Sequence, residues 1–139
     1  MITERSCGAV IYTKDNGQTE YVIVRSRQGF YGFPKGHVEG TETEQETALR
    51  EVTEEVGLSV DLLPDFRVED SYLFTWDGEE HFKRVVYYLA EYSGQIPVAQ
   101  ESELSSVHLL SFEEAMSVFQ FDNLKQILTK ANTFLSSRE

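Results

Sequence analysis

Residues 36–58 read GHVEGTETEQETALREVTEEVGL, and this stretch decides the fold and the chemistry expected of the chain. It places three carboxylates close together: Glu51, Glu54 and Glu55. Like charges three and four residues apart on a helix repel one another and destabilise it. A bound cation commonly offsets such repulsion, although an acid-rich helix can also simply face solvent. The stretch therefore predicts either a metal site or a solvated acidic face.

Residues 43–56 are expected to form the helix that carries these carboxylates. Two capping-box pairs fit its start, Thr41 with Glu44 and Thr43 with Glu46. Gly57 suits the position that follows the last turn. At about 100° per residue, the apolar stripe expected to face the core consists of Ala48, Val52, Val56 and Leu49. The three glutamates lie about 240° to 340° around the helix from Ala48, so they share one arc beside that stripe.

The flanking sequence predicts strands on both sides of this helix and two helices near the end of the chain. Apolar runs predict strands at residues 4–13, 20–26, 68–75, 81–92 and 105–110. Residues 28–36 contain three glycines and a proline, which predicts a loop. Ser111 with Glu114 begins a short helix, and Asp122 is expected to cap the last one. The order predicts an α/β (α+β) fold, a mixed β-sheet between helices, in a single domain of residues 1–139.

The charge and the apolar runs exclude two classes of partner. The net charge is −12 at pH 7, so no nucleic-acid partner is expected, because phosphates are attracted by lysine and arginine. The apolar runs are too short to cross a bilayer, and Met1 to Arg5 leads into a strand pattern rather than a signal sequence. Cys7 is the sole cysteine and is expected to be a small buried strand residue. We therefore expect a cytoplasmic protein without a membrane partner.

The carboxylate stretch has the chemistry of a magnesium or manganese site. Carboxylate oxygens are hard ligands that suit Mg²⁺ or Mn²⁺. Arg50 is the only cation within residues 43–56 and lies beside Glu54, where it can orient the carboxylate. Gly36 and Gly40 allow the loop backbone to approach a metal closely. A site of this kind predicts hydrolysis of a phosphoanhydride, in which the metal lowers the pKa of water and a spare carboxylate accepts a proton.

The spacing of particular residues favours the metal site over the solvated face. These residues are Gly36, Glu42, Arg50, Glu51, Val52, Glu54, Glu55, Gly57 and Leu58. Their pattern resembles the complete signature of the Nudix hydrolases, and every fixed position matches. The resemblance implies the Nudix fold, an α/β/α sandwich, and hydrolysis of a nucleoside diphosphate linked to another group.

The resemblance also implies a role for each residue of the motif. The metal ligands would be Gly36, through its carbonyl, and Glu51, Glu54 and Glu55. Glu54 and Glu55 are in addition candidates for activating water. Arg50 would orient the carboxylates, and Glu42 would hold the turn from loop to helix. Many members use a further glutamate from a later loop as ligand or base, and it maps to Glu103, with Glu101 second.

Similarity beyond the motif points to one group within the family. The matching runs are SCGAVIY (6–12), FPKGHVEG (33–40), KRVVYYLAEY (83–92) and SFEEAMSVFQFDNLKQILTKANTFL (111–135). They are similar to the asymmetrically cleaving diadenosine tetraphosphate hydrolases of the animal and archaeal type. The resemblance implies hydrolysis of diadenosine tetraphosphate to ATP and AMP by metal-activated water. Residues 58–81 offer no clear match.

Several residues are candidates for binding this substrate. Lys35 and His37 flank Gly36, so both can reach phosphates near the metal. Lys83 and Tyr87 share one face of their strand, where one would bind phosphate and the other would stack on a base, although a solvated lysine and a core tyrosine fit equally well.

The group implies a second aromatic contact to the substrate. Its members sandwich an adenine between a tyrosine of this strand and a phenylalanine of the last helix. The matching positions are Tyr87 and Phe134, for which a place in the core is the alternative.

Three functions remain open at this level. The first is hydrolysis of a dinucleoside polyphosphate. The second keeps the Nudix pyrophosphohydrolase chemistry but acts on nucleoside triphosphates, RNA 5′ ends, inositol pyrophosphates or another nucleoside diphosphate derivative. The third is a nucleotide-sensing module without turnover, which would be expected to have lost the carboxylates that stand here.

Overall fold

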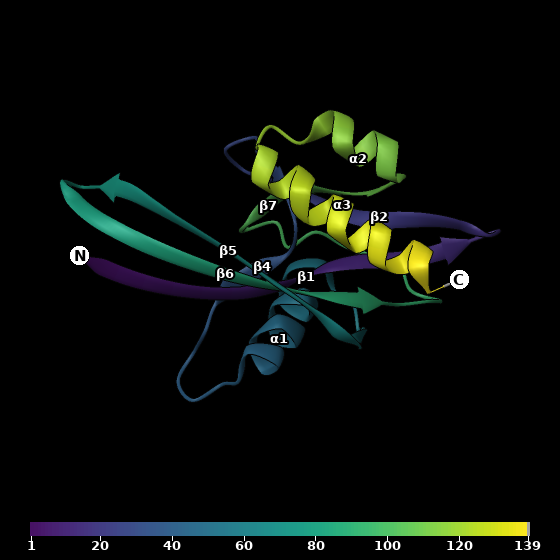
Figure 1. Cartoon of the computed structure of the whole chain (residues 1–139), viewed down its shortest axis with the longest axis horizontal. Helices are drawn as coiled ribbons and strands as arrows, with labels where there is room; N and C mark the ends of the chain where they lie inside the picture. The colour runs from purple at the N-terminus through teal and green to yellow at the C-terminus, as the bar shows by residue number, and fades with distance from the viewer. Residues whose placement is uncertain (139) are drawn as a thin grey trace.

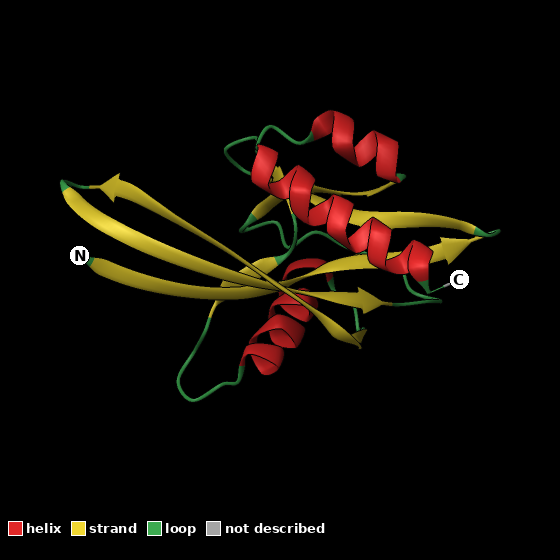
Figure 2. Ribbon diagram, in the orientation of Figure 1, coloured by secondary structure: helices red, strands yellow, loops and turns green. Residues whose placement is uncertain are grey.

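The computed structural model describes residues 1–138, which form a mixed seven-stranded sheet between helices (Figures 1 and 2). The strands are β1 (Ile2–Asp15), β2 (Gln18–Ser26), β3 (Tyr31–Gly32), β4 (Lys35–His37), β5 (Asp61–Trp76), β6 (Glu79–Glu91) and β7 (Leu104–Leu110). The helices are α1 (Glu44–Val56), α2 (Phe112–Val118) and α3 (Asp122–Ser137). Helix α1 covers one face of the sheet, and α2 and α3 cover the other, which confirms the predicted layers. Within residues 1–138, no helix is long and apolar enough to span a membrane.

Strand β1 is the centre of the sheet. It pairs in parallel with β6 along one edge, from Ile2 to Tyr12. Its other edge is shared, because β4 pairs with residues 6–8 and β2 pairs with residues 12–15. The sheet therefore divides between β2 and β4, and this division leaves a passage from the face of α1 to the face of α3.

The alternation of side chains along the strands builds a core on each face. Val10 and Leu89 pack with Leu128 of α3, whereas Ile11 and Ala90 lie in the cluster that contains Val52 of α1. Residues 21–24 of β2 are all buried, since this strand is covered on both faces, as its apolar run predicted.

Helix α1 matches its predicted ends and three of the four residues of its predicted core stripe, Ala48, Val52 and Val56. Thr43 and Glu46 form the capping box, and Gly57 ends the helix in the left-handed conformation at φ 68°. Leu49 was expected in the core stripe but is 38% exposed, whereas Glu55 is 8% exposed. The helix is rotated so that Ala48 and Val52 lie at the centre of the contact, which turns one carboxylate inward.

Three other predictions were wrong in part. Asp122 was expected to cap α3, but it is the first helical residue and Phe121 takes the cap position without a side-chain hydrogen bond. Strand β5 begins at Asp61 rather than at residue 68. Pro64 does not end the strand, because it lies in an irregularity of the pairing between Leu62 and Arg67, where its missing N–H is tolerated. The loop expected at residues 28–36 contains the short strand β3 and the start of β4.

Candidate active site

The three carboxylates of α1 differ in their exposure to solvent. Glu55 is buried, the Glu51 side chain is 13% exposed, and the Glu54 side chain is 49% exposed. Burial raises the pKa of Glu51 above its usual value. The three carboxylates therefore range from buried to half-exposed, with Glu55 and Glu51 turned toward the sheet, and do not form a uniformly solvated acidic surface.

Arg50 connects these carboxylates to the loop before the helix. Its Nη1 donates to Oε1 of Glu51 at 2.8 Å and to Oε2 of Glu54 at 3.1 Å. Its Nε donates to Oε2 of Glu42 at 2.7 Å, and its Nη2 donates to the carbonyl of His37 at 2.9 Å. The Arg50 guanidinium holds the pKa of Glu42 low, at about 2. These contacts place Arg50 and Glu42 where the motif predicted them.

Gly36 allows the backbone of β4 to lie directly against the α1 carboxylates. A Cβ on this residue would lie 2.0 Å from Cδ of Glu51, so no other residue type fits without displacement. Gly36 is held at this place by pairing with Cys7 of β1. The side chain of Cys7 is buried, as expected, and burial raises the pKa of its thiol to about 11, so the thiol is not a nucleophile at neutral pH.

Glu55 and Lys35 meet at the passage between β2 and β4. The backbone N–H of Lys35 donates to Oε2 of Glu55 at 3.3 Å. Burial raises the pKa of Glu55 to about 7, and the charges of Glu51 and Glu103 act in the same direction. Burial also lowers the pKa of Lys35, with Lys83 contributing in the same direction and Glu55 opposing it. Glu55 is therefore protonated more easily, and Lys35 is deprotonated more easily, than the same side chains in water.

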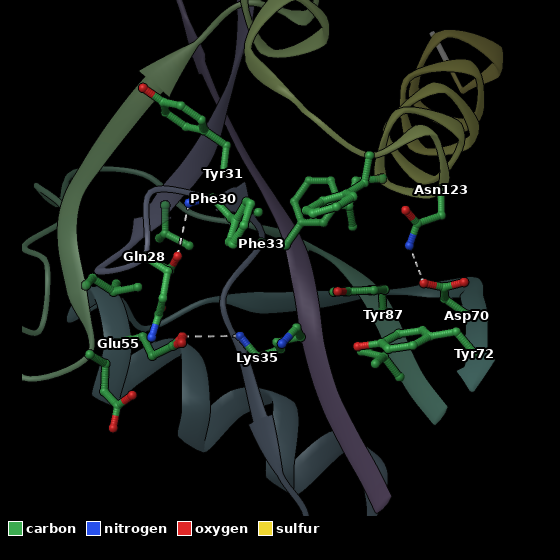
Figure 3. Close-up of a pocket in the computed structure, with 18 of the residues that line it drawn as sticks. Gln28, Phe30, Tyr31, Phe33, Lys35, Glu55, Asp70, Tyr72, Tyr87 and Asn123 are labelled. Carbon is green, nitrogen blue, oxygen red and sulfur yellow. Dashed lines mark hydrogen bonds between the residues drawn. The ribbon is translucent and has the colours of Figure 1, made fainter. Parts of the chain in front are cut away.

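A cavity of about 770 Å³ begins at this pair and lies between the sheet and α3. Its polar lining includes Lys35, Glu55 and Glu103. Figure 3 shows Glu55 and Lys35 at one end, while Tyr72 and the hydrogen-bonded pair Asp70 and Asn123 lie at the other. The cavity thus joins the carboxylate cluster to a surface built by strand β5 and the start of α3.

The structure separates the two glutamates considered for the later loop. Glu103 lines the cavity, and its charge acts on Glu55. Glu101 is exposed, as Glu103 is, but it does not line the cavity, and its backbone carbonyl accepts a hydrogen bond from Arg27. This placement favours Glu103 over Glu101.

The predicted aromatic pair does not enclose the cavity together. Tyr87 forms part of the wall but is 2% exposed, with its ring packed edge-on against Phe33 at 5.4 Å. Phe134 packs edge-on against Phe66 at 5.4 Å and does not line the cavity. Phe134 lies in the second half of α3, whereas the cavity meets the first half, at Asn123 and Leu124, so this cavity does not bring the two predicted rings together.

The two remaining candidates lie beside the cavity rather than in its lining. His37 is exposed, and its backbone carbonyl is held by Arg50. Lys83 is partly buried on β6, directly opposite Tyr72 of β5 and Glu4 of β1. Its charge reaches Lys35, so the two ammonium groups lie along one path from the carboxylates to β5.

Three exposed rings of the cavity are not among the substrate-binding residues predicted from the sequence. Tyr72 is 41% exposed, Phe30 is 50% exposed and Phe121 is 44% exposed, and Phe30 and Phe121 contact one another at 5.3 Å. Their faces are available to a ligand, unlike the faces of the buried Tyr87. The signal available for Tyr72 was the alternation of β5, which places it two residues from Asp70 on one side of the strand.

The residues present fit a hard divalent cation. Within residues 1–138, no three carboxylate, imidazole or thiolate side chains converge as a ready-made ligand set, because Arg50 holds Glu51 and Glu54. The potential donors of α1 are all oxygens, and the missing side chain of Gly36 leaves its backbone beside Glu51. Such a donor set suits Mg²⁺ or Mn²⁺ rather than a softer metal.

Comparison with known proteins agrees with this geometry. The family model described as NUDIX domain matches residues 3–131. The asymmetrical bis(5′-nucleosyl)-tetraphosphatase of Mus musculus is 33% identical over 96% of both chains, and that of Sus scrofa is 32% identical over the same shares. The enzyme of that name from Caenorhabditis elegans is 26% identical over 95% of this chain and 96% of its own.

Solved structures show the same fold at lower identity. The binary complex of the C. elegans Ap4A hydrolase has a TM-score of 0.83 at 24% identity and covers 96% of this chain and 98% of its own. The E. coli dihydroneopterin triphosphate pyrophosphohydrolase has a TM-score of 0.73 at 19% identity and covers 94% of this chain and 97% of its own. Because the family model spans nearly the whole chain and the residues of the signature lie together around Arg50, this protein belongs to the Nudix hydrolase family.

Proposed function

We propose that the protein hydrolyses a phosphoanhydride bond of a dinucleoside polyphosphate, and that it cleaves diadenosine tetraphosphate to ATP and AMP in the presence of Mg²⁺. The observation that carries this proposal is a single cavity with a carboxylate and a lysine at one end and exposed aromatic rings at the other. Such a cavity matches a ligand that combines phosphates with a nucleobase. The names of the relatives that match nearly the whole chain support the same substrate class.

The carboxylate cluster would hold the divalent cation. Glu51, Glu54 and Glu55 would supply carboxylate oxygens, and Gly36 would supply its carbonyl. When bound, Mg²⁺ neutralises phosphate charge and lowers the pKa of a coordinated water. Arg50 keeps Glu51 and Glu54 oriented through paired hydrogen bonds, so the cluster loses little side-chain entropy when a ligand arrives.

Two carboxylates lining the cavity can take the proton of an attacking water. Glu55 is buried, and burial raises its pKa to about 7 in the metal-free protein, so this carboxylate can accept a proton when it does not bind the cation. Glu103 faces the same space from the loop before β7. Comparing Glu55→Gln with Glu103→Gln assigns the role: the base variant loses kcat, and the loss recovers most at high pH, where hydroxide replaces the base.

The remaining contacts position the two ends of the substrate. Lys35 and Lys83 would bind phosphates along the path from Glu55 toward β5. Tyr72, Phe30 and Phe121 offer exposed ring faces for stacking on a base. These rings replace Tyr87 and Phe134 in that role, because Tyr87 is buried and Phe134 does not line the cavity.

A substrate panel with identified products tests the proposal. We expect purified protein with Mg²⁺ to release ATP and AMP from diadenosine tetraphosphate, at a kcat/KM well above that for nucleoside triphosphates, and EDTA to abolish turnover. In ¹⁸O-labelled water, attack on the outer phosphorus places the label in AMP. A higher kcat/KM for triphosphates or capped RNA 5′ ends would assign the protein to another Nudix substrate class.

A further inference from the structure

The sheet continues beyond its helices at one end. In Figures 1 and 2, the start of β1 and the hairpin of β5 and β6 project past α1, α2 and α3. Strand pairing holds this projection together, with Ile2 opposite His81 and His81 opposite Phe74. We call the projecting residues 1–4 and 73–82 the arm. Its faces are not covered by a helix, so side chains there are free to meet a ligand.

One face of β5 carries aromatic side chains at every second position from the cavity into the arm. Tyr72 lines the cavity, its ring contacts Phe74 at 5.9 Å, and Phe74 stacks on the buried ring of His81 at 4.8 Å and 18°. Trp76 follows two residues later and is 70% exposed. We call Phe74 and Trp76 the distal aromatic strip.

The strip lies on the cavity face of the sheet. Val68 pairs with Tyr87, Tyr72 pairs with Lys83, and Phe74 pairs with His81, so alternation keeps these side chains on one side. Leu73 is 64% exposed and points to the opposite side. At about 3.3 Å per residue, Phe74 and Trp76 lie roughly 7 and 13 Å beyond Tyr72 along the strand.

Charge along this face is mixed near the cavity, where Asp70 and Glu4 lie among the lysines, and acidic at the tip. Lys35 and Lys83 mark the near part. The turn at the end of the arm carries acidic residues, which are Asp77, Glu79 and Glu80. Phosphates would therefore be favoured beside Lys83 and disfavoured at the tip, whereas an uncharged base and ribose are tolerated there.

We propose that the distal aromatic strip binds the second nucleoside of a two-nucleoside substrate, with Trp76 stacking on its base. The inference rests on the proposed function and adds to it a specificity determinant: a mononucleotide that fills the cavity has no group to place on the strip. The acidic tip favours a single neutral nucleoside over a polynucleotide chain, because the further phosphates of a polynucleotide would meet Glu79, which lies opposite Trp76.

Kinetics with paired substrates test this assignment. Adenosine 5′-tetraphosphate offers the same phosphates as diadenosine tetraphosphate without the second nucleoside. We expect Trp76→Ala to raise KM for diadenosine tetraphosphate about tenfold with kcat unchanged, and to leave KM for adenosine tetraphosphate within about twofold. Trp76→Phe should restore most of the loss. Leu73→Ala is the matched control, since it removes an exposed apolar side chain from the other face of the same strand.

Fluorescence gives a second readout that does not depend on turnover. Trp76 is the sole tryptophan of the chain, so its emission reports directly on the strip. We expect a methylene-bridged, non-hydrolysable analogue of diadenosine tetraphosphate to quench this emission, and adenosine tetraphosphate at saturation to leave it nearly unchanged.

The outcomes separate the failure of this inference from the failure of the proposed function. If wild-type protein does not cleave diadenosine tetraphosphate, both are overturned. If it does, but Trp76→Ala affects both substrates equally, or no more than Leu73→Ala, only the strip is overturned. A change of oligomeric state in Trp76→Ala without a change in substrate preference would instead make the arm a contact between copies of the chain.

Discussion

The cavity has the α1 carboxylate cluster at one end, where Glu55 enters the lining, and an aromatic wall elsewhere, made of Tyr72, Phe30 and Phe121. The two regions are built in different ways. The cluster comes from residues near one another in sequence, held by Arg50 through hydrogen bonds of 2.7 to 3.1 Å. The wall comes from β5, α3 and the β2–β3 loop, and its rings are exposed. The chemistry is therefore encoded locally and held firmly, whereas substrate choice depends on surfaces assembled from distant parts of the chain.

The largest effect is expected at the buried end of the cluster. Glu55→Gln keeps the shape of the side chain but removes a metal-binding oxygen and a candidate base, so kcat should fall about a thousandfold. Thermal unfolding should stay at least as high as in the wild type, since the variant no longer buries an ionisable group. Steady-state kinetics with Mg²⁺ and calorimetry measure the two quantities. Activity within tenfold of the wild type would remove Glu55 from the mechanism.

Stability of the metal-free protein should fall as pH rises through the range in which Glu55 ionises. Its pKa is raised from 4.5 to about 7 in the folded chain, so the folded state binds more protons than the unfolded state between these values. The free energy of unfolding should therefore decrease by up to about 3 kcal/mol from pH 4.5 to 7. Denaturant titrations in EDTA measure this slope, and Glu55→Gln should flatten it. A slope that persists in the variant would assign it to another group.

Gly36→Ala tests how closely the backbone must approach the cluster. The added Cβ would collide with the Glu51 carboxylate, so we expect kcat/KM to fall about a hundredfold and stability to fall by about 1–3 kcal/mol. The double variant Gly36→Ala/Glu51→Ala should recover stability but not activity. Recovery of neither would mean that the collision distorts β4 itself rather than the carboxylate.

A pair of aromatic variants tests whether Tyr72 or Phe134 contacts the substrate. Tyr72→Ala should raise KM about tenfold with little change in stability, because its exposed ring supports the ligand rather than the core. Phe134→Ala should lower stability by about 1–3 kcal/mol and leave KM unchanged, because its ring packs on Phe66. Kinetics and denaturation of both proteins decide the matter. The opposite result would restore Phe134 as the substrate contact.

The smallest effect is expected outside both regions, at Glu44 of α1 and Arg67 of β5. Their paired hydrogen bonds of 3.0 and 2.9 Å are partly exposed. Glu44→Gln should lower stability by only about 0.5–1 kcal/mol, and the difference should shrink in high salt. Urea titrations at two salt concentrations measure it. A difference that is unchanged by salt would point to the hydrogen bond from Tyr88 instead.

Sequence reasoning was most successful where a feature depends on neighbours along the chain. The capping box of Thr43 and the left-handed Gly57 follow from local backbone hydrogen bonding, and both were placed correctly. Arg50 was expected beside Glu54 and lies there, because residues four apart share a helix face. The start of β5 was missed, because Pro64 reads as a break in sequence and only the pairing with β6 shows that the strand continues past it.

The sequence by itself indicated the reaction class, because the spacing of nine positions in residues 36–58 resembles the Nudix signature. Helical geometry alone places Glu51, Glu54 and Glu55 together but leaves a solvated acidic face open. Tertiary structure decided which rings face the substrate. Tyr87 and Tyr72 are both strand tyrosines, but packing against Phe33 buries the first, and the position of β5 at the edge of the sheet leaves the second exposed. Burial depends on what covers a residue, and the covering elements come from elsewhere in the chain.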